Sequence, residues 1–320
     1  MSRCMRQTKG CAPTILFALF HSVCIIISLK GVAKMPELVE VETARRILAP
    51  QVSGCTIEDA EVRLAKSIKN YSPEEFKKLV LGSKFDTVLR RGKFLIFNML
   101  TPKHEGAPEE LKLVAHYRMT GVLLVTPPGY EELKHTHIVF KLRDDDGTEK
   151  ELRYIDQRQF GGIWAITTGA EFRATGIGQL GAEATDDTLE GEYLKGHLAK
   201  RKSAIKTGLL DQSVIAGLGN IYTDEILYRC GIIPTRACNS LTDDEWQALA
   251  SEIPKMINFM IEKNQISEED YLAGKGTDYR NTPFLQVYNH AGEECQKCGS
   301  KLERAVIAGR SSVYCPECQE

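Results

Sequence analysis

Four cysteines near the C-terminal end constrain the fold more than any other feature of the chain. Cys295 and Cys298 are separated by two residues, as are Cys315 and Cys318, and sixteen residues lie between the pairs. Two such pairs typically converge on one tetrahedral Zn²⁺. Four thiolates fill the coordination shell, so the spacing predicts a structural zinc, with disulfide pairing as the alternative. Zinc contributes on the order of 10 kcal/mol or more to a module with little core, and free thiolates indicate a reducing compartment.

Residues 1–34 differ in kind from the rest of the chain. Three basic residues precede a mostly apolar run over residues 12–29, and no acidic residue occurs before Met35. This layout is typical of a signal peptide or a short membrane anchor. The rest of the chain has an ordinary polar composition, so we expect synthesis to begin at Met35, with a genuine targeting segment as the alternative. We also expect residues 1–34 to pack poorly on the fold.

The charge balance restricts how the chain could bind nucleic acid. It has 41 Lys and Arg and 43 Asp and Glu, and five of the basic residues lie in residues 1–34. A mildly acidic protein can bind DNA only if its positive charge gathers on one face. Residues 90–93, 195–206 and 301–310 are candidate clusters, although each could be ordinary solvated surface. The remaining length is enough for two modest domains.

The first half of the chain has the pattern of short helices and many strands. Apolar residues at helical spacing predict a helix over residues 37–48, ended by Pro50. Ser72, Pro73 and Glu75 have the spacing of a helix start with a capping box. Strands are expected at residues 84–90, 93–99, 113–125, 137–143, 151–155 and 162–167. These strands predict a two-layer antiparallel β-sandwich within an α+β fold.

The second half is predicted to be helical. Helical periodicity occurs over residues 185–200, 203–210, 221–229 and 242–263. Between two of these helices, Gly217, Gly219 and Asn220 form a turn directly before residue 221. Glycines allow a ligand to approach the backbone, and helix N-terminal amides attract phosphate. A plain turn between helices is the alternative.

Six ordered motifs together resemble one family, the bacterial formamidopyrimidine-DNA glycosylases, which excise oxidised purines. The motifs are Pro36-Glu37-Leu38 with Glu40-Val41-Glu42, Arg91-Gly92-Lys93, His116-Tyr117-Arg118-Met119-Thr120-Gly121, Asp156-Gln157-Arg158-Gln159-Phe160-Gly161, Gly217-Leu218-Gly219-Asn220-Ile221-Tyr222, and Gly309-Arg310 with the four cysteines. The resemblance covers nearly the whole chain after Met35.

The resemblance implies a domain organisation with DNA held between two domains. Residues 1–34 would be a signal-like or wrongly assigned extension, and residues 35–183 a catalytic β-sandwich. Residues 184–284 would form a helical DNA-binding domain with a helix-two-turns-helix motif. Residues 285–320 would form the zinc finger.

The resemblance also implies a chemistry that depends on a free N-terminal proline. After removal of Met35, the nitrogen of Pro36 would attack the sugar carbon that holds the damaged base and form a Schiff base. The pKa of an α-amino group is roughly 8 and that of a lysine roughly 10.4. A larger fraction of a terminal amine is therefore uncharged at neutral pH, which makes it the better nucleophile. Glu37 would act as general acid and base, and Lys93 and Arg310 would assist catalysis. Strand cleavage by β- and δ-elimination would follow.

Further residues match the family's DNA contacts. Met119, Arg158 and Phe160 match the side chains that fill the gap left by an everted nucleotide. Lys206 and Asn220, together with Arg310, match phosphate contacts. Gln157 and Gln159 depart from the common form, which has Pro and Arg there, so one phosphate contact is expected to be lost. Residues 273–279 resemble a loop that closes over the lesion, and His135 and His137 are interpreted as surface residues.

The function implied is a bifunctional DNA glycosylase and AP lyase of base excision repair that removes 8-oxoguanine and formamidopyrimidines. Its partner would be double-stranded DNA containing oxidised bases, its one cofactor a structural Zn²⁺, with no small-molecule cofactor. We expect a monomer in the cytoplasm, associated with the nucleoid. Two alternatives remain: an endonuclease VIII-like glycosylase for oxidised pyrimidines, or, if residues 1–34 are retained, a non-catalytic and possibly membrane-tethered DNA-binding zinc protein.

Overall fold

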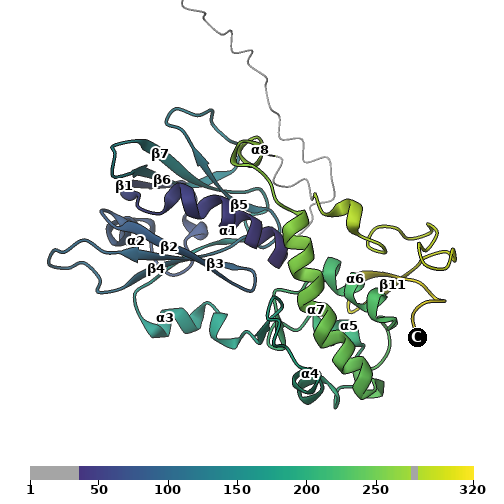
Figure 1. Cartoon of the computed structure of the whole chain (residues 1–320). Coiled ribbons are helices and arrows are strands. Elements are labelled where there is room, and N and C mark those ends of the chain that lie inside the picture. The colour runs from purple at the N-terminus through teal and green to yellow at the C-terminus, as the bar shows by residue number, and fades with distance from the viewer. Residues whose placement is uncertain (1–35, 275–279) are drawn as a thin grey trace, which may run out of the picture.

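The structure is a computed structural model that describes residues 36–274 and 280–320. Its N-terminal part holds eight strands in one antiparallel sheet with the order β5-β7-β6-β1-β2-β3-β4-β8. The strands are β1 (Thr56–Val62), β2 (Lys84–Arg91), β3 (Phe94–Leu100), β4 (Leu111–His116), β5 (Gly121–Thr126), β6 (Thr136–Arg143), β7 (Glu149–Asp156) and β8 (Gly162–Ile166). Figure 1 shows the two domains and the thin grey traces of residues outside this description.

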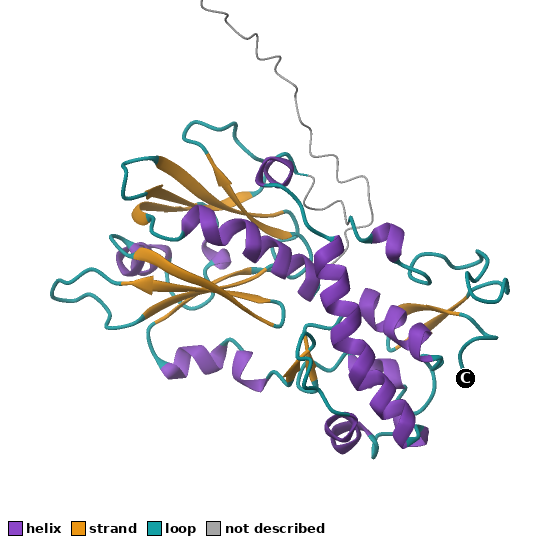
Figure 2. Ribbon diagram, viewed as in Figure 1, coloured by secondary structure: helices purple, strands orange, loops and turns teal. Residues whose placement is uncertain are grey.

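The sheet folds at the junction between β1 and β2 into two layers, so the predicted sandwich is confirmed. Their pairing is short, with Thr56 opposite Lys84. Four strands lie on each side of this junction in the sheet order, and Figure 2 shows the strands as two separate layers. Side chains from both layers form one core that includes Ile57, Phe97 and Phe140. Burying such large apolar side chains is the main source of stability for this arrangement.

Two helices close the sandwich. Helix α1 (Leu38–Val52) packs against β2 and β5, which belong to different layers. Helix α2 (Pro73–Val80) begins at the predicted cap, where the amide of Glu75 donates to Oγ of Ser72 across 3.3 Å. The prediction that Pro50 ends the first helix was wrong, because α1 continues to Val52. A proline in the last turn removes only one helical hydrogen bond, which packing can offset.

One predicted strand proved to be two strands from different layers. The predicted segment 113–125 is divided into β4 and β5 by a turn at residues 117–120. Arg118 in this turn has a left-handed backbone with φ +54°. A left-handed residue cannot continue a strand, so the chain leaves one layer at His116 and enters the other at Gly121.

Helices form the second domain, with a separate core that includes Leu194, Leu227 and Trp246. They are α4 (Gly191–Leu198), α5 (Ile205–Leu209), α6 (Asn220–Cys230) and α7 (Asp243–Lys263), whereas α3 (Gly169–Ala174) packs on β8 of the sandwich and α8 (Glu268–Leu272) packs on β5. The predicted helix over 185–200 is only α4, because Asp186 instead accepts from the amide of Thr188 and forms a turn. The capped helix predicted at residue 242 is confirmed. The predicted domain boundaries at residues 183 and 284 stay predictions.

Two short elements connect the parts. Strands β9 (Ala182–Glu183) and β10 (Ile215–Ala216) pair in parallel beneath the domain junction. A hairpin of β11 (Glu303–Ile307) and β12 (Arg310–Tyr314) follows at the C-terminal end and packs on α6. No helix within residues 36–274 and 280–320 combines the length and apolar content that a bilayer span requires. The expectations for residues 1–34 and for most of the loop at 273–279 fall outside the described residues.

Candidate active site

The start of α1 lies where the two domains meet. Its first residues, Leu38 and Val39, are fully buried in the core of the helical domain, whereas the rest of α1 packs on the sandwich. The amide of Leu38 donates to the carbonyl oxygen of Gly217 across 3.2 Å. Gly217 has φ +98°, and a Cβ there would lie 2.3 Å from Cδ1 of Leu38. This position therefore requires glycine, and it brings the 217–221 turn directly against Glu37 and Leu38.

Glu37 is held by the N-terminal end of α6. Its side chain is 1% exposed, and Oε1 accepts from the amide of Ile221 across 3.0 Å. A Cβ on Gly219 would lie between 2.2 and 2.5 Å from the three carboxylate atoms. The amide of Ile221, expected to attract a phosphate oxygen, is therefore occupied by Glu37. Among residues 36–274 and 280–320, no group donates to Oε2 of Glu37, which leaves that oxygen available for proton transfer.

A second carboxylate, Glu40, supports the first and was given no role in the sequence analysis. Its Oε2 accepts from the amide of Glu37 across 2.8 Å, and its Oε1 accepts from the hydroxyl of Tyr222 across 2.6 Å. Burial raises the pKa of Glu37, and the nearby charge of Lys93 opposes this only in part. Burial and the charge of Glu37 raise the pKa of Glu40 to about 7. Both carboxyls are therefore biased toward the protonated form.

Lys93 lies in the tight turn between β2 and β3, as predicted. It is half-buried, and the loss of hydration lowers the pKa of its ammonium, with the charge of Glu37 opposing and that of Arg310 adding to the effect. This mutual influence shows that Lys93, Glu37 and Arg310 are electrostatic neighbours, although they come from three separate segments.

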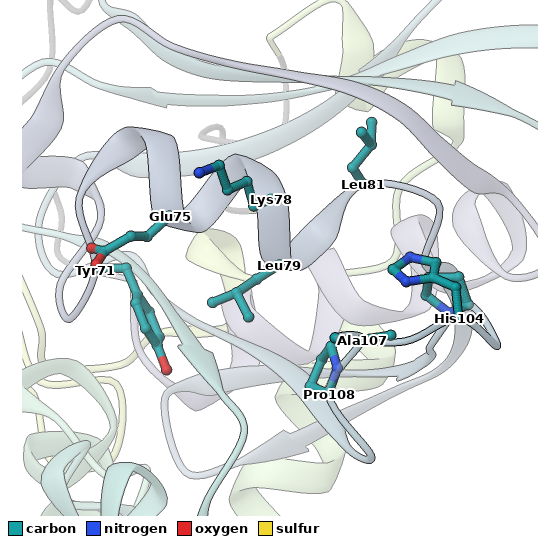
Figure 3. A pocket seen from close by; sticks show the side chains of 10 residues that line it. Tyr71, Glu75, Lys78, Leu79, Leu81, His104, Ala107 and Pro108 are labelled. Atoms are coloured by element: carbon teal, nitrogen blue, oxygen red, sulfur yellow. The ribbon is translucent and has the colours of Figure 1, made fainter.

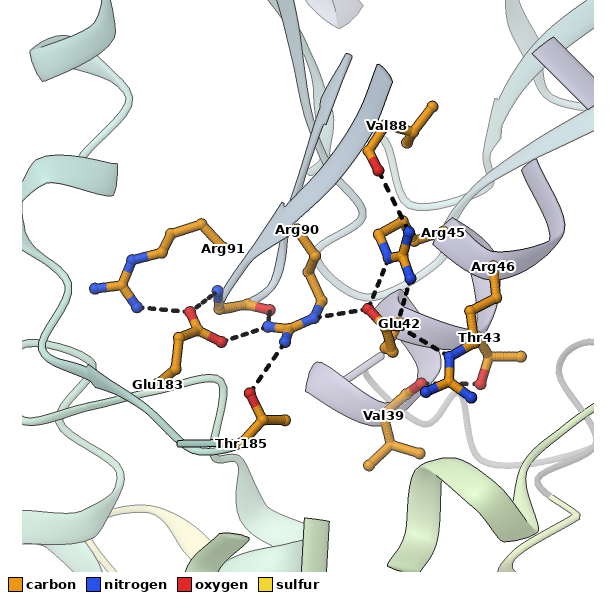
Figure 4. A network of polar contacts seen from close by, with 11 residues as sticks. Val39, Glu42, Thr43, Arg45, Arg46, Val88, Arg90, Arg91, Glu183 and Thr185 are labelled. Carbon is orange, nitrogen blue, oxygen red and sulfur yellow. Dashed lines mark hydrogen bonds and ion pairs between the residues drawn. The ribbon is translucent and has the colours of Figure 1, made fainter. Parts of the chain in front are cut away.

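An ion-pair network holds the Lys93 turn against the helical domain (Figure 4). Glu183 of β9 pairs with Arg90 and Arg91, in each case across 2.6 Å, and accepts from the amide of Gly92 across 2.6 Å. Arg90 also pairs with Glu42 of α1 across 3.1 Å. The basic residues at 90–91 are thus neutralised by carboxylates, so they are not part of a free DNA-binding surface.

Lys206 is buried, although the resemblance implied that it contacts a DNA phosphate. Its side chain is 0% exposed, and Nζ donates to Asp224 across 2.7 Å and to the carbonyl of Ser311 across 2.9 Å. An ammonium with no exposed surface cannot contact a DNA phosphate, so the position corrects that prediction. Asn220, at the start of α6, is half-buried with an Oδ1 that lacks a partner among the described residues. Arg310 is exposed at the start of β12.

The three predicted gap-filling residues lie on two adjoining turns of the sandwich. Met119 is on the turn between β4 and β5, and Arg158 and Phe160 are on the turn after β7. Phe160 is 57% exposed, although it is large and apolar. The Arg158 guanidinium lies 5.3 Å from the Phe160 ring centre. His137, interpreted as a surface residue, is in fact buried, with Nε2 lying 2.8 Å from the carbonyl oxygen of Asp156.

The four predicted zinc ligands come together in the C-terminal finger. Their sulfur atoms all lie within 4.8 Å of one another, with 3.9 Å between Cys295 and Cys318 and 3.5 Å between Cys298 and Cys315. A tetrahedral zinc with Zn–S bonds near 2.3 Å needs sulfurs roughly 3.8 Å apart. The donor set therefore fits one structural Zn²⁺.

A separate hollow lies under α2 on the sandwich and is lined by residues that include Tyr71, Leu79 and Pro108 (Figure 3). None of the predicted site residues lines it. Its titratable lining residues Glu75, Lys78 and His104 are exposed, unlike the buried carboxyls at the start of α1, so we assign the hollow no part in the chemistry.

Comparisons with known proteins match the chain in three consecutive segments. Residues 35–163 match the formamidopyrimidine-DNA glycosylase N-terminal domain, residues 180–271 match the H2TH domain of the same enzymes, and residues 292–320 match the zinc finger found in FPG and IleRS. The third match and the sulfur geometry together confirm the structural zinc.

Individual relatives match over almost their entire length. A formamidopyrimidine-DNA glycosylase of Pelotomaculum thermopropionicum is 40% identical over 286 residues, which cover 89% of this chain and 99% of that protein. One from Carboxydothermus hydrogenoformans is 40% identical over 286 residues, covering 89% and 100%. The Lactococcus lactis Fpg in complex with DNA containing an abasic site has a TM-score of 0.78 and 31% identity, covering 89% of this chain and 100% of that one. Its complex with DNA containing Fapy-dG has a TM-score of 0.77 and 31% identity.

Proposed function

Because the chain belongs to the formamidopyrimidine-DNA glycosylase family, we propose that it excises oxidised purines from duplex DNA with Pro36 as nucleophile and Glu37 as proton donor. The protein is a DNA glycosylase of base excision repair and an AP lyase, and its partner is DNA that carries oxidised bases or abasic sites. The residue assignments and the preference for purines are our proposal.

The main support for this proposal is the position of the Glu37 carboxyl at the domain junction. A buried carboxyl with one oxygen fixed by Ile221 and the other unbonded among the described residues is oriented for directional proton transfer. Burial raises the pKa of this carboxyl, which favours the protonated form that a proton donor needs. The adjacent Pro36 is half-buried at the same junction.

The reaction follows from these two residues. With Met35 removed, the lone pair of the Pro36 nitrogen forms a bond to C1′ of the damaged nucleotide while the glycosidic bond breaks. The base leaves with the electron pair of that bond and takes up the proton that the proline nitrogen loses. Glu37 protonates the sugar ring oxygen, so the ring opens and an iminium forms. The iminium acidifies the neighbouring sugar protons, and successive β- and δ-elimination cleaves the strand. While Met35 remains attached, the same nitrogen is an amide and has no nucleophilic lone pair.

The remaining site residues would bind and shape the DNA. Arg310 and Asn220 would contact phosphates next to the lesion, with Arg310 placed by the zinc finger. Lys93, whose pKa is lowered by loss of hydration and to a smaller extent by the positive charge of Arg310, would contact a phosphate or assist proton transfer. Met119, Arg158 and Phe160 would replace the everted nucleotide in the stack. We place the enzyme in the cytoplasm with the nucleoid, where thiolate zinc ligands stay reduced.

Borohydride trapping on single-stranded DNA with one abasic site tests the nucleophile. Borohydride reduces the iminium, so wild type should become covalently attached to DNA, and Pro36→Gly should be trapped far less. Pro50→Ala in the last turn of α1 is the matched control and should be trapped like wild type. Equal trapping of Pro36→Gly and wild type would overturn the assignment. Mass analysis of the N-terminus should show a chain that begins at Pro36.

The preference of the enzyme for oxidised purines or oxidised pyrimidines is tested separately. Duplexes with 8-oxoguanine opposite cytosine and with thymine glycol opposite adenine separate the purine enzyme from the endonuclease VIII-like alternative. We expect faster excision of 8-oxoguanine in single-turnover assays. Faster excision of thymine glycol would contradict the purine proposal and leave the Pro36 chemistry intact.

A further inference from the structure

Two turns of the sandwich that are far apart in the sequence are tied to one buried side chain. The first turn, residues 117–120, carries Met119, and the second, residues 157–161, carries Arg158 and Phe160. Both contain a residue with a left-handed backbone, Arg118 at φ +54° and Gln159 at φ +59°. Such backbones cost about 1–2 kcal/mol each for residues other than glycine, so other contacts must hold these turns in shape.

The contacts converge on the carboxylate of Asp156, which is 1% exposed at the end of β7. From the first turn, the hydroxyl of Thr120 donates to Oδ1 across 2.5 Å. From the second turn, the amide of Arg158 donates to Oδ1 across 3.2 Å and the amide of Gly161 to Oδ2 across 2.9 Å. The hydroxyl of Tyr154 completes the set at 3.2 Å from Oδ2.

The two turns also contact each other directly. The amide of Arg158 donates to Oγ1 of Thr120 across 2.9 Å. A Cβ on Gly161 would lie 2.5 Å from the carbonyl oxygen of His116 and 3.0 Å from that of Tyr117, so the second turn lies directly on the first. The turns therefore form one hydrogen-bonded unit with Asp156 at its centre.

We propose that Asp156 is a positioning residue that locks Met119, Arg158 and Phe160 into one preformed unit for insertion into DNA. This inference rests on the function proposed for those three side chains. Eversion of a nucleotide costs a few kcal/mol of stacking and pairing, and ordering two mobile turns at the same moment would add to that cost. A preformed unit avoids the additional ordering. It also keeps the Arg158 guanidinium at a fixed place from which to distinguish the base opposite the lesion.

A carboxylate suits this position because both of its oxygens accept hydrogen bonds. Each oxygen of Asp156 accepts from one backbone N–H, that of Arg158 on one side and that of Gly161 on the other. An asparagine has nearly the same shape, but its NH₂ group cannot accept, so one of these two backbone amides loses its bond to position 156. If the NH₂ group faces Arg158, that amide keeps only its bond to Oγ1 of Thr120. Asp156→Asn therefore weakens the connection to one turn while leaving the packing volume nearly unchanged.

The test compares Asp156→Asn with Asp144→Asn in the zinc-loaded enzyme on two substrates. Asp144 lies beyond the other end of β7, where it accepts from the amide of Thr148 across 2.9 Å and pairs with Lys150 across 3.0 Å. One substrate is a duplex with 8-oxoguanine opposite cytosine or adenine. The other is a single strand with an abasic site, which needs no eversion and no gap filling.

We expect Asp156→Asn to slow single-turnover excision from the duplex by about 10- to 100-fold, as for a reacting group misplaced by about 1 Å. Its preference for cytosine over adenine opposite the lesion should shrink, and incision of the single strand should stay within about twofold of wild type under the same positional argument. Asp144→Asn should match wild type on both substrates. Thr120→Val, which removes one hydroxyl, should shift duplex excision in the same direction by less.

Two outcomes would overturn the proposal. An equal decrease in rate on duplex and single-stranded DNA would mean that Asp156 only supports the fold. An unchanged rate of duplex excision would mean that Asp156 is not needed to hold the two turns in place. Failure of the wild-type enzyme itself to be trapped on single-stranded abasic DNA would instead count against the Pro36 mechanism.

Discussion

Lys206 donates from Nζ to Oδ1 of Asp224 across 2.7 Å, and neither side chain has any exposed surface. The same carboxylate accepts from the hydroxyl of Ser312 across 2.6 Å, and the same ammonium donates to the carbonyl of Ser311. Lys206 comes from α5, Asp224 from α6, and both serines from β12, one and two residues after Arg310. The buried pair therefore joins the helical domain to the strand that carries Arg310.

Removing one member of this pair should be costly. Lys206→Met leaves the Asp224 carboxylate buried without its cation, which typically costs about 3–5 kcal/mol. The double variant Lys206→Met with Asp224→Leu should recover part of that loss in urea denaturation of the zinc-loaded protein. Lys195→Met, which removes a half-buried lysine paired with the exposed Asp243, should change stability little. An equally mild effect of Lys206→Met would show that the pair does not hold the finger.

Gly219→Ala should impair catalysis through Glu37. The added methyl would lie 2.2 Å from Cδ of Glu37, so the carboxyl must leave its seat on the amide of Ile221. We expect base excision to fall about 100-fold in single-turnover assays with the fold retained. The matched control is Gly196→Ala in α4, where a Cβ would meet nothing within 4 Å. Unchanged excision by Gly219→Ala would contradict the placement of the proton donor.

His116 should make the enzyme sensitive to acid. Burial, with a smaller effect from nearby positive charge, lowers its pKa to about 3, and Nδ1 accepts from the amide of Arg118 across 2.9 Å. The folded state therefore needs the neutral ring, whereas the unfolded chain takes up a proton below about pH 6.5. The stabilising contribution is present above pH 6.5 and is lost as pH falls toward 3.

Between pH 6.5 and 5 this loss should amount to about 1.6 kcal/mol. His116→Asn keeps an acceptor for the Arg118 amide but cannot take up the proton. Urea denaturation at both pH values should therefore show a smaller decrease in stability for the variant. Parallel pH dependence of the two proteins would rule out His116 as the cause.

Removal of one zinc ligand should weaken DNA binding by the finger while the sandwich stays folded. Cys315→Ser is expected to release zinc, measured by a colorimetric chelator, and to weaken binding to abasic duplex DNA, because the hairpin that carries Arg310 loses its anchor. The circular dichroism of the sandwich should persist. Cys230→Ser, a half-buried cysteine outside the zinc cluster, should keep the metal. Normal DNA binding by Cys315→Ser would contradict the role given to the finger.

The sequence by itself determined the parts that depend on local spacing. The cysteine pairs, the capped helices that begin after Ser72 and Thr242, and most strands were predicted correctly, because short-range patterns encode them. The motifs at Pro36, Gly217 and Arg310 identified the family for the same reason.

Tertiary structure decided which charged and polar groups are buried, and by what they are held. From the sequence alone, Lys206 is expected to be a surface cation. In the folded chain it is buried and donates to Asp224 and Ser311. Glu37 finds its partner at Ile221, 184 positions away, and Asp156 gathers donors from two separate turns. Hydration and hydrogen bonding of a charged group depend on neighbours that the folded chain brings together, and periodicity along the chain carries no record of them.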